Sequence, residues 1–260
     1  MLKEYEAALV EKKLLGTGNI LLTFACADIA KMAEPGQFVN VSCSLFLKRP
    51  FGICTVDPIG NTFSIGVKEV GAGTQDILTA SVGDVFSILG PLGHGFSFDG
   101  VKKIIAVGGG TGIYPLYFAL DKAKRKGIPA ICVNGFRSRQ DAFFLSECEE
   151  LSGKTIFASD AGDLGVKGTV MDALELLQPE DLADATVLVV GPEIMMKKVS
   201  AWANQHKLSC QVSLEKRMAC GFGICLVCVC KIKSDAENMP FHHVRCCKEG
   251  PVFQASEVIW

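Results

Sequence analysis

The sequence predicts an α/β protein with an added β domain: an N-terminal antiparallel β-barrel, a doubly wound parallel α/β domain, and a small cysteine-rich C-terminal lobe. Short β-rich runs separated by Gly and Pro turns occupy the N-terminal third, which is typical of small barrels. From Val101, buried strands alternate with helical stretches, which predicts a parallel sheet. Seven of the 12 cysteines fall between Cys210 and Cys247. We expect domains at 1–98, 99–213 and 214–260.

The composition excludes two classes of partner. A net charge of -2 over 260 residues provides no excess of Lys and Arg for phosphate backbones, so we expect no nucleic acid. The first residues lack the apolar centre of a signal peptide, and Gly and Pro interrupt the apolar run at 104–120. We therefore expect no membrane span and a cytoplasmic protein, in which crowded cysteines indicate a metal rather than disulfides.

For the barrel we expect strands at 38–42, 63–67 and 85–89. The segment between the first two strands includes Arg49-Pro50-Phe51-Gly52. It combines a positively charged side chain, a proline that predicts a turn, and an aromatic ring. Arg49 is suited to a pyrophosphate, and Gly52 would let the backbone approach a flat cofactor. The glycine-rich segment 70–74 is a second candidate phosphate cradle. Either segment by itself is more often a solvated loop.

For the second domain we expect strands at 102–107, 130–135 and 186–190, helices at 114–126, 142–151 and 193–206, and further elements at 154–159 and 170–177. Two glycine turns follow buried strands and open helices, which suits them to hold the phosphates of a nucleotide. Their residues are Gly108, Gly109, Gly110, Thr111 and Gly112 in the first turn, and Gly191 and Pro192 in the second. The first turn is not the G-x-G-x-x-G fingerprint, because Ile113 takes the last glycine position, and a purely structural turn is the alternative.

Two arginines follow the strand at 130–135. Arg137 and Arg139 are suited to the extra phosphate of NADP. We favour the alternative that both are solvated loop cations, because exposed arginine is common.

The cysteines of the C-terminal lobe have the spacing C-x4-C-x2-C, formed by Cys220, Cys225 and Cys228. This is the spacing of plant-type [2Fe-2S] ligation, in which a glycine-containing loop turns backbone N–H groups toward the sulfides. A zinc site is the weaker alternative, since its ligand pairs are usually spaced differently. The fourth ligand is Cys246 or Cys247, and Cys230 also competes for a place.

In order, these motifs resemble those of the ferredoxin-reductase-like flavoproteins, and more narrowly the electron-transfer subunits of NAD-linked (class 1B) dihydroorotate dehydrogenase. The resemblance spans nearly the whole chain and rests on segments 49–52, 73–74, 90–96, 108–115, 218–228 and 247–253. It implies a barrel that binds FAD, a domain that admits NAD, and a [2Fe-2S] lobe facing an FMN-containing catalytic subunit, in a heterotetramer of two plus two chains. That partner oxidises dihydroorotate to orotate in pyrimidine biosynthesis, and electrons pass through the cluster and FAD to NAD+.

The resemblance also implies individual roles. FAD would contact Arg49, Pro50, Phe51, Gly52, Gly66, Val67, Lys68, Gly73 and Thr74, and the irons would be held by Cys220, Cys225, Cys228 and Cys247. Cys247 is preferred over Cys246 because it directly precedes the Lys-Glu-Gly-Pro run. The sequence departs from the family pattern at Gly52, where many relatives have Ser or Thr, and at Val190, where many reductases have Cys. We therefore name no catalytic acid or base.

Two alternatives stay open. A related NAD(P)H reductase subunit that serves ferredoxin, sulfide or hydrogenase chemistry would use the same fold and carriers. A zinc-stabilised nucleotide-binding regulator would transfer no electrons.

Overall fold

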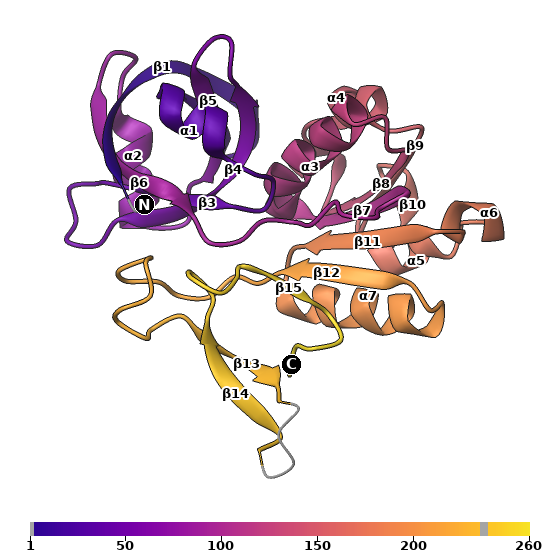
Figure 1. The fold of residues 1–260 in the computed structure, drawn as a ribbon. Helices are drawn as coiled ribbons and strands as arrows, with labels where there is room; N and C mark the ends of the chain where they lie inside the picture. The colour runs from indigo at the N-terminus through magenta and orange to yellow at the C-terminus, as the bar shows by residue number, and fades with distance from the viewer. Residues whose placement is uncertain (1–2, 235–238) are drawn as a thin grey trace.

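A computed structural model describes residues 3–234 and 239–260 of the chain. A barrel, an α/β sheet and a small hairpin lobe follow one another along the chain, and the lobe lies beneath the other two units (Figure 1). The predicted fold class is confirmed. In the described residues, no helix has both the length and the apolar character that a membrane crossing requires.

The barrel closes in the strand order β1-β2-β5-β4-β3-β6. Its strands are β1 (Glu4–Gly16), β2 (Asn19–Ala25), β3 (Phe38–Val41), β4 (Arg49–Asp57), β5 (Thr62–Lys68) and β6 (Val85–Leu92), with the helices α1 (Ala27–Met32) and α2 (Ala72–Thr79). Side chains such as Phe24, Phe63 and Ile65 fill the interior and are fully buried. All three predicted strands are confirmed, with small changes at their ends.

One prediction in the barrel is wrong. The segment from Arg49 to Gly52 is not a turn but the first part of β4, paired antiparallel with β3. Pro50 lies opposite Asn40 in this ladder. A proline in a strand looks like a turn signal in sequence, because it lacks an N–H, but a barrel tolerates it near a strand end.

The second unit is a seven-stranded sheet in the order β10-β9-β8-β7-β11-β12-β15. Its strands are β7 (Lys103–Gly109), β8 (Ala130–Phe136), β9 (Lys154–Ser159), β10 (Val166–Lys167), β11 (Ala185–Val190), β12 (Ser209–Ser213) and β15 (Val252–Gln254). The strands pair in parallel except at the β15 edge. The helices are η1 (Gly110–Gly112), α3 (Ile113–Arg125), η2 (Arg139–Asp141), α4 (Leu145–Leu151), α5 (Val170–Leu174), α6 (Pro179–Leu182) and α7 (Glu193–Gln205).

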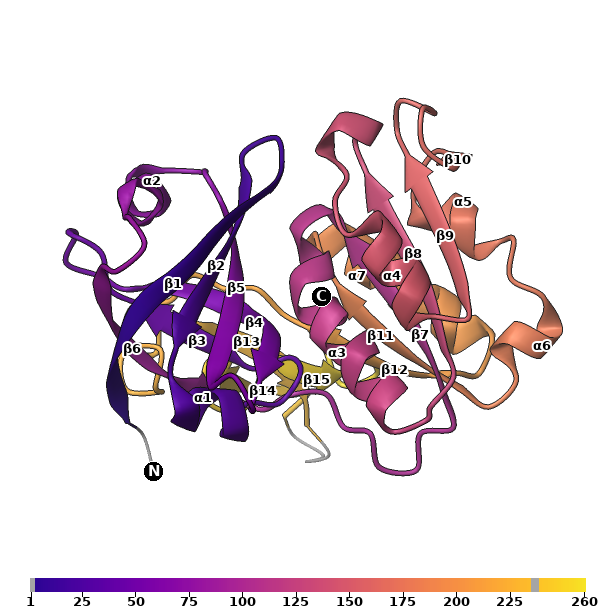
Figure 2. The same ribbon diagram turned by 90° about the horizontal axis from the view of Figure 1, so that it is seen from above.

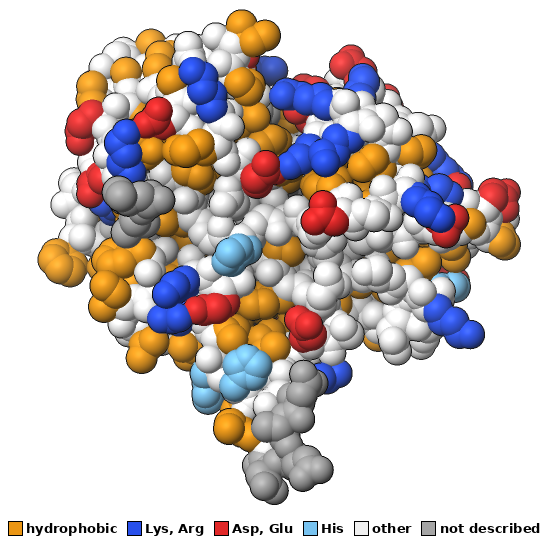
Figure 3. Space-filling view, viewed as in Figure 1, with side chains coloured by type: hydrophobic (Ala, Val, Ile, Leu, Met, Phe, Trp, Pro, Cys, Tyr) orange, Lys and Arg blue, Asp and Glu red, His pale blue; other side chains and the backbone are white. Residues whose placement is uncertain are grey.

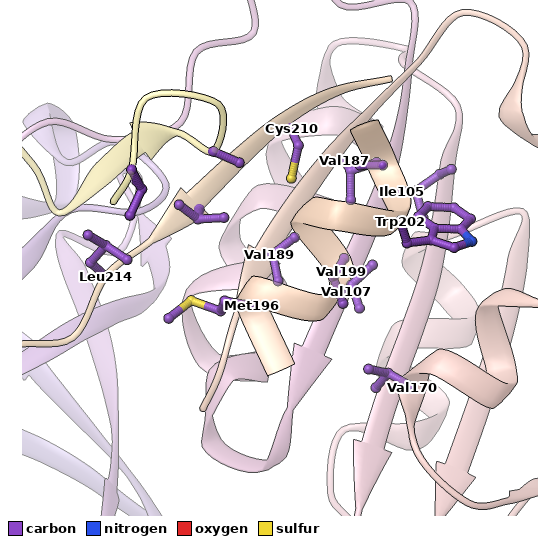
Figure 4. Close-up of a cluster of buried hydrophobic side chains, with 14 of the residues drawn as sticks. Ile105, Val107, Val170, Val187, Val189, Met196, Val199, Trp202, Cys210 and Leu214 are labelled. Atoms are coloured by element: carbon purple, nitrogen blue, oxygen red, sulfur yellow. The ribbon is translucent and has the colours of Figure 1, made fainter. Parts of the chain in front are cut away.

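Helices cover both faces of this sheet, as Figure 2 shows. In β7, Ile105 and Val107 point to the face covered by α5 and α7, where they meet Val199 and Trp202 (Figure 4). Ile104 and Ala106 point to the opposite face, covered by α3 and α4. Strands buried on both faces are apolar throughout, which is why the sequence predicts them well.

Two predicted elements are shorter in the structure. The helix expected at 142–151 begins at Leu145, because Phe144 takes a left-handed backbone conformation, with φ 58°. The element expected at 170–177 is the helix α5, which ends at Leu174. The exact residue at which a helix begins or ends depends on packing more than on the residue pattern.

The lobe has a two-stranded hairpin of β13 (Val229–Lys233) and β14 (Phe241–Arg245). The chain then returns to the α/β sheet, where β15 pairs antiparallel with β12. The N–H of Leu214 also donates to the carbonyl of Pro251, at 2.9 Å. The lobe is therefore fastened to the sheet at both of its ends, which the sequence did not reveal.

Candidate functional site

A cavity of about 470 Å³ lies where the barrel, the sheet and the lobe meet; we call it the barrel-side cavity. Seven of the nine predicted flavin-contact residues line it: Arg49, Pro50, Phe51, Gly52, Gly66, Lys68 and Thr74. Val67 does not, because its side chain is fully buried in the barrel core. Gly73 does not line it either, and a side chain there would collide with the guanidinium of Arg49.

Tyr114, at the start of α3, forms part of the cavity wall and is absent from the predicted site. Its ring packs so closely on Gly66 that no Cβ fits there. Its hydroxyl donates to Asn19 Oδ1 at 3.2 Å, and its ring stacks on Phe143 with centroids 4.9 Å apart. Burial raises the pKa of Tyr114, so it is a neutral group. The glycine at position 66 therefore serves the packing of barrel against sheet as well as the cavity.

The two departures from the family pattern also lie at this cavity. Gly52 and Val190 both line it. An ideal Cβ on Gly52 would lie 3.5 Å from Pro115 Cβ, an ordinary contact. Neither position offers a hydroxyl or a thiol to the cavity.

A second cavity, of about 550 Å³, opens at the carboxyl edge of the sheet; we call it the sheet-edge cavity. The predicted residues Gly109, Gly110, Thr111, Gly191 and Pro192 line it. The first three precede α3 and the last two precede α7, and each helix has 13 residues. Backbone N–H groups and helix dipoles at this place favour phosphate groups.

Gly108 and Gly112 do not line the sheet-edge cavity and have packing roles instead. A Cβ on Gly108 would collide with Asn134 Oδ1, and a Cβ on Gly112 would collide with the carbonyl of Val190. The glycine turn therefore lies tightly against the neighbouring strands. Asn134 itself is buried, and neither polar atom of its side chain has a hydrogen-bond partner within the described residues.

Arg137 and Arg139 have different surroundings. Arg137 lines the sheet-edge cavity together with Lys198. Arg139 is held by the loop after β9, where its backbone N–H donates to Asp163 Oδ1 at 2.9 Å and its Nε donates to the Asp163 carbonyl at 3.3 Å. The interpretation as a loop cation thus fits Arg139, while Arg137 is available to a ligand.

The loop at 219–228, which we call the cysteine loop, and Cys247 after β14 bring four thiols together as two pairs. The N–H of Cys225 donates to Cys220 Sγ at 3.4 Å, and the N–H of Cys220 donates to Cys225 Sγ at 3.5 Å. The N–H of Cys247 donates to Cys228 Sγ at 3.4 Å. Burial, and then the thiols of Cys228 and Cys220, raise the pKa of Cys247 to about 12. Within the described residues, no three ligand groups converge on the position of a single metal ion.

The two competing cysteines point elsewhere. Cys246 is buried, and its thiol donates to the carbonyl of Leu214 at 3.1 Å. The thiol of Cys230 faces the Val244 carbonyl across the hairpin, at 3.8 Å. Burial raises the pKa of both thiols. Both cysteines therefore behave as packed hydrophobic residues with a local acceptor.

Cys220 has the opposite electrostatic character. Burial opposes its ionisation, but backbone N–H groups of Cys225, Phe222 and Ile224 lower the pKa of its thiol to about 6. A loop that offers several N–H groups to a thiolate is suited to an iron–sulfur cluster, whose sulfur atoms accept the same bonds. The donor set and the paired arrangement thus fit a two-iron cluster.

A buried asparagine joins the cysteine loop to the barrel. Asn40 in β3 donates from Nδ2 to the carbonyl of Cys220 at 3.4 Å. Gly221 packs against the same amide so tightly that a Cβ would collide with it, and its φ of +76° also favours glycine. Asn40 contacts the cysteine loop, and its partner across the β3–β4 ladder, Pro50, lines the barrel-side cavity. One residue pair of the ladder therefore lies between the cysteine loop and that cavity.

Large apolar side chains are exposed on the lobe and on the loop between β3 and β4. They are Phe222, Ile224, Leu226, Val227 and Val229 in the lobe, and Leu45, Phe46 and Leu47 in the β3–β4 loop. We call these eight residues the apolar face. Phe46 is 99% exposed, yet its loop is anchored, since Asp76 accepts from the Ser44 N–H at 2.7 Å. Hydrophobic side chains gather at the lower left of the molecule, where barrel and lobe meet (Figure 3).

The barrel, the nucleotide sheet and the cysteine lobe together define a reductase of the flavin- and nicotinamide-binding type with an added iron–sulfur domain. Residues 106–201 match the family model of the oxidoreductase NAD-binding domain. Residues 215–259 match that of the iron–sulfur cluster binding domain of dihydroorotate dehydrogenase B. These matches confirm the predicted NAD-binding and iron–sulfur domains, and the reductase fold supports the predicted flavin.

Relatives identify the family. The chain is 38% identical to the electron transfer subunit of dihydroorotate dehydrogenase B (NAD(+)) from Enterococcus faecalis, over 99% of this chain and 98% of that protein. It is 37% identical to the subunit of that name from Listeria monocytogenes, over 92% of each chain. The chain belongs to the family of dihydroorotate dehydrogenase B electron transfer subunits, as predicted.

Solved structures of other reductases share the fold. A chain of the NADH-dependent reduced ferredoxin-NADP oxidoreductase superposes with a TM-score of 0.85 and 27% identity, over 98% of this chain and 90% of that one. The flavohem-like FAD/NAD binding domain of a Vibrio cholerae nitric oxide dioxygenase shares the fold, with a TM-score of 0.69 and 17% identity over 80% of this chain and 97% of that one.

Proposed function

We propose that this subunit carries electrons from an FMN-containing catalytic partner, through a [2Fe-2S] cluster and FAD, to NAD+. The observation that carries the proposal is the adjacency of three places: the paired thiols, the barrel-side cavity and the sheet-edge cavity. Bound FAD supplies the exchange between single electrons and a hydride, which a cluster and a nicotinamide cannot perform with each other directly. The overall reaction balances, since oxidation of dihydroorotate releases two electrons and two protons, and NAD+ takes up two electrons and one proton.

In this proposal the two thiol pairs divide the irons between them. Cys220 and Cys225 hold one iron, and Cys228 and Cys247 hold the other. The hydrogen-bonded contacts within each pair support this division. Cys246 instead fixes Leu214, and through it the start of the lobe.

The barrel-side cavity is the proposed place of the flavin. Arg49 and Lys68 supply positive charge there, while Phe51, Tyr114 and Pro115 supply apolar walls. A flavin needs this combination, because it has a flat ring system and a charged pyrophosphate. Val67 and Gly73 contribute through the barrel core and the packing of Arg49.

The sheet-edge cavity is the proposed place of NAD. Its backbone donors at Gly109–Thr111 and its cations Arg137 and Lys198 suit the pyrophosphate and the adenosine end. Gly108 and Gly112 act indirectly, since they let the turn lie close to β8 and β11. We retain the division into 1–98, 99–213 and 214–260 as functional units, although β15 returns to the sheet.

The apolar face is the proposed docking surface of the catalytic subunit. Electrons can enter the lobe only if the partner comes close to the cysteine loop, and that loop carries four of the eight exposed apolar residues, with Val229 directly after it. Anchored, exposed aromatic and aliphatic side chains are typical of interface centres. We propose the heterotetramer of two plus two chains on the family resemblance alone.

The test is anaerobic co-expression with the catalytic subunit, followed by purification of the complex. We expect a complex with two irons and two sulfides per subunit, one FAD, and a visible spectrum that dihydroorotate bleaches and NAD+ restores. Isolation with a hydrogenase or a ferredoxin-linked partner would favour the related reductase instead. A colourless protein that contains zinc and no flavin would refute the relay.

The docking surface needs its own test. Phe46→Ser in the β3–β4 loop is expected to weaken binding of the catalytic subunit by about tenfold or more, as loss of a central aromatic anchor does. Ile59→Ser, an equally exposed apolar site on the β4–β5 turn outside the apolar face, is the matched control. Equal affinities of both variants and the unmodified subunit, measured by calorimetry, would place the partner elsewhere.

A further inference from the structure

Three polar residues line both cavities: Lys68, Thr111 and Glu215. They come from three different parts of the chain, namely the end of β5, the glycine turn after β7, and the segment after β12. Because they belong to both cavities, they mark the place where the two meet. The sequence pointed to Lys68 and Thr111 but gave no signal for Glu215.

The backbone on each side of Glu215 is fixed. Leu214 is buried (Figure 4), its N–H donates to the Pro251 carbonyl at 2.9 Å, and its carbonyl accepts from the Cys246 thiol at 3.1 Å. On the other side, Lys216 Nζ forms an ion pair with Glu193 at 2.8 Å. The position of Glu215 is therefore defined by its neighbours, and the adjacent lysine is already paired.

The carboxylate of Glu215 has no compensating partner. It forms no ion pair or hydrogen bond with any residue in 3–234 or 239–260. The residue is exposed to solvent where the two cavities meet, and neighbouring protein atoms still raise the pKa of its carboxyl group by partial desolvation. An unpaired acidic group with a shifted pKa on the wall of two adjoining cavities is a candidate ligand group.

We propose that Glu215 binds the nicotinamide ring of the nucleotide and favours its cationic, oxidised form. The inference rests on the proposed function, since it takes the sheet-edge cavity as the NAD site. The nicotinamide must reach the junction to meet the flavin, and Glu215 lies on its wall. A carboxylate attracts the positive charge of the oxidised ring, which disappears when the ring accepts a hydride. The subunit thus holds NAD+ at the junction and releases NADH more readily.

The test measures binding rather than turnover, with the oxidised complex of both subunits and three probes. The probes are NAD+, its neutral and redox-inert tetrahydronicotinamide analogue, and ADP-ribose, which lacks the ring. We expect Glu215→Gln to weaken NAD+ about tenfold, the scale of one screened charge contact. The neutral analogue should change by less than about twofold, and ADP-ribose should not change.

Two further variants make the result decisive. Glu180→Gln makes the same chemical change on α6, outside both cavities, and should leave all three affinities unchanged. Glu215→Asp keeps the charge and should keep the preference for NAD+ over the neutral analogue. It replaces Glu215→Gln as the test variant if the Gln variant does not assemble with the catalytic subunit. Equal weakening of NAD+ and the neutral analogue, or no weakening, would overturn the role of Glu215. Failure of the unmodified complex to bind any probe would instead overturn the proposed NAD site.

Discussion

The α/β sheet and the cysteine lobe differ in what keeps them folded. The sheet has helices on both faces, with Ile105 and Val107 fully buried between them. The lobe has one two-stranded hairpin, and much of its cysteine loop exposes apolar side chains. Apolar burial can stabilise a sheet of this kind, whereas a small loop-rich lobe needs an inorganic centre or a partner. The comparison implies that the lobe can be lost while the sheet stays folded.

The largest effect is expected from the cluster ligands. Cys247→Ser should abolish the cluster, because it removes one thiolate from the pair with Cys228. Cys246→Ser should retain it, since a serine hydroxyl can still donate to the Leu214 carbonyl. Iron and sulfide analysis of anaerobically purified complexes distinguishes them, and the reverse pattern would make Cys246 the fourth ligand. Circular dichroism should show the sheet intact in both variants.

Removal of a buried apolar side chain tests whether apolar burial is what stabilises the α/β sheet. Ile105→Ala should lower the free energy of unfolding by about 3 kcal/mol, the usual cost of a cavity at a fully buried site. Ile59→Ala, at a side chain that is 94% exposed, should cost less than about 0.5 kcal/mol. Urea denaturation followed by circular dichroism provides both values. Similar values would mean that burial does not dominate the stability of this unit.

Asn40 connects the barrel to the cysteine lobe. Its substitution should destabilise the protein less than the loss of Ile105. Asn40→Ala removes the bond to the Cys220 carbonyl and leaves space beside Gly221. We expect a loss of about 1–2 kcal/mol, felt mainly in the lobe. Hydrogen exchange should accelerate around 219–228 and not in the barrel strands, and Asn204→Ala, on the exposed side of α7, is the control. Uniform acceleration would show that Asn40 serves the barrel alone.

The smallest effect concerns an ion pair at the far end of the sheet. Lys154 donates to Asp181, and this bond lowers the pKa of Asp181 below its ordinary value of 3.8. A lowered carboxyl pKa stabilises the fold at neutral pH, and this contribution is lost as the pH falls through the folded-state value. Asp181→Asn should therefore cost at most about 1 kcal/mol at pH 7. The difference should shrink as the pH falls below the ordinary carboxyl value and disappear only below the folded-state pKa of Asp181, where both proteins carry a neutral side chain. A constant difference in urea midpoints across this range would exclude the ion pair as its cause.

Much of the site follows from local sequence pattern. The apolar strand before Gly108 and the helix after Gly112 identify a nucleotide turn, because buried parallel strands and glycine turns have strong local signatures. The spacing of Cys220, Cys225 and Cys228 likewise indicates a cluster. Arg49 to Gly52 line the barrel-side cavity, but the sequence predicts a turn where the structure has a strand, because proline is common both in turns and at strand ends.

Other site residues have no local signature. Tyr114 and Glu215 look like an ordinary helix tyrosine and an ordinary surface glutamate in sequence. They reach the cavities because barrel, sheet and lobe pack together around them. Asn40 is likewise defined only by its contact with a residue 180 positions away.

The sequence by itself therefore determined the order of units, the carriers and the three-cysteine motif, because periodicity and ligand spacing are local properties of the chain. The tertiary structure decided which thiol joins Cys228, which glycines face a cavity rather than a neighbour, and where the two cavities meet. Those features depend on contacts between segments distant in sequence, and the physical terms that fix them are packing and desolvation.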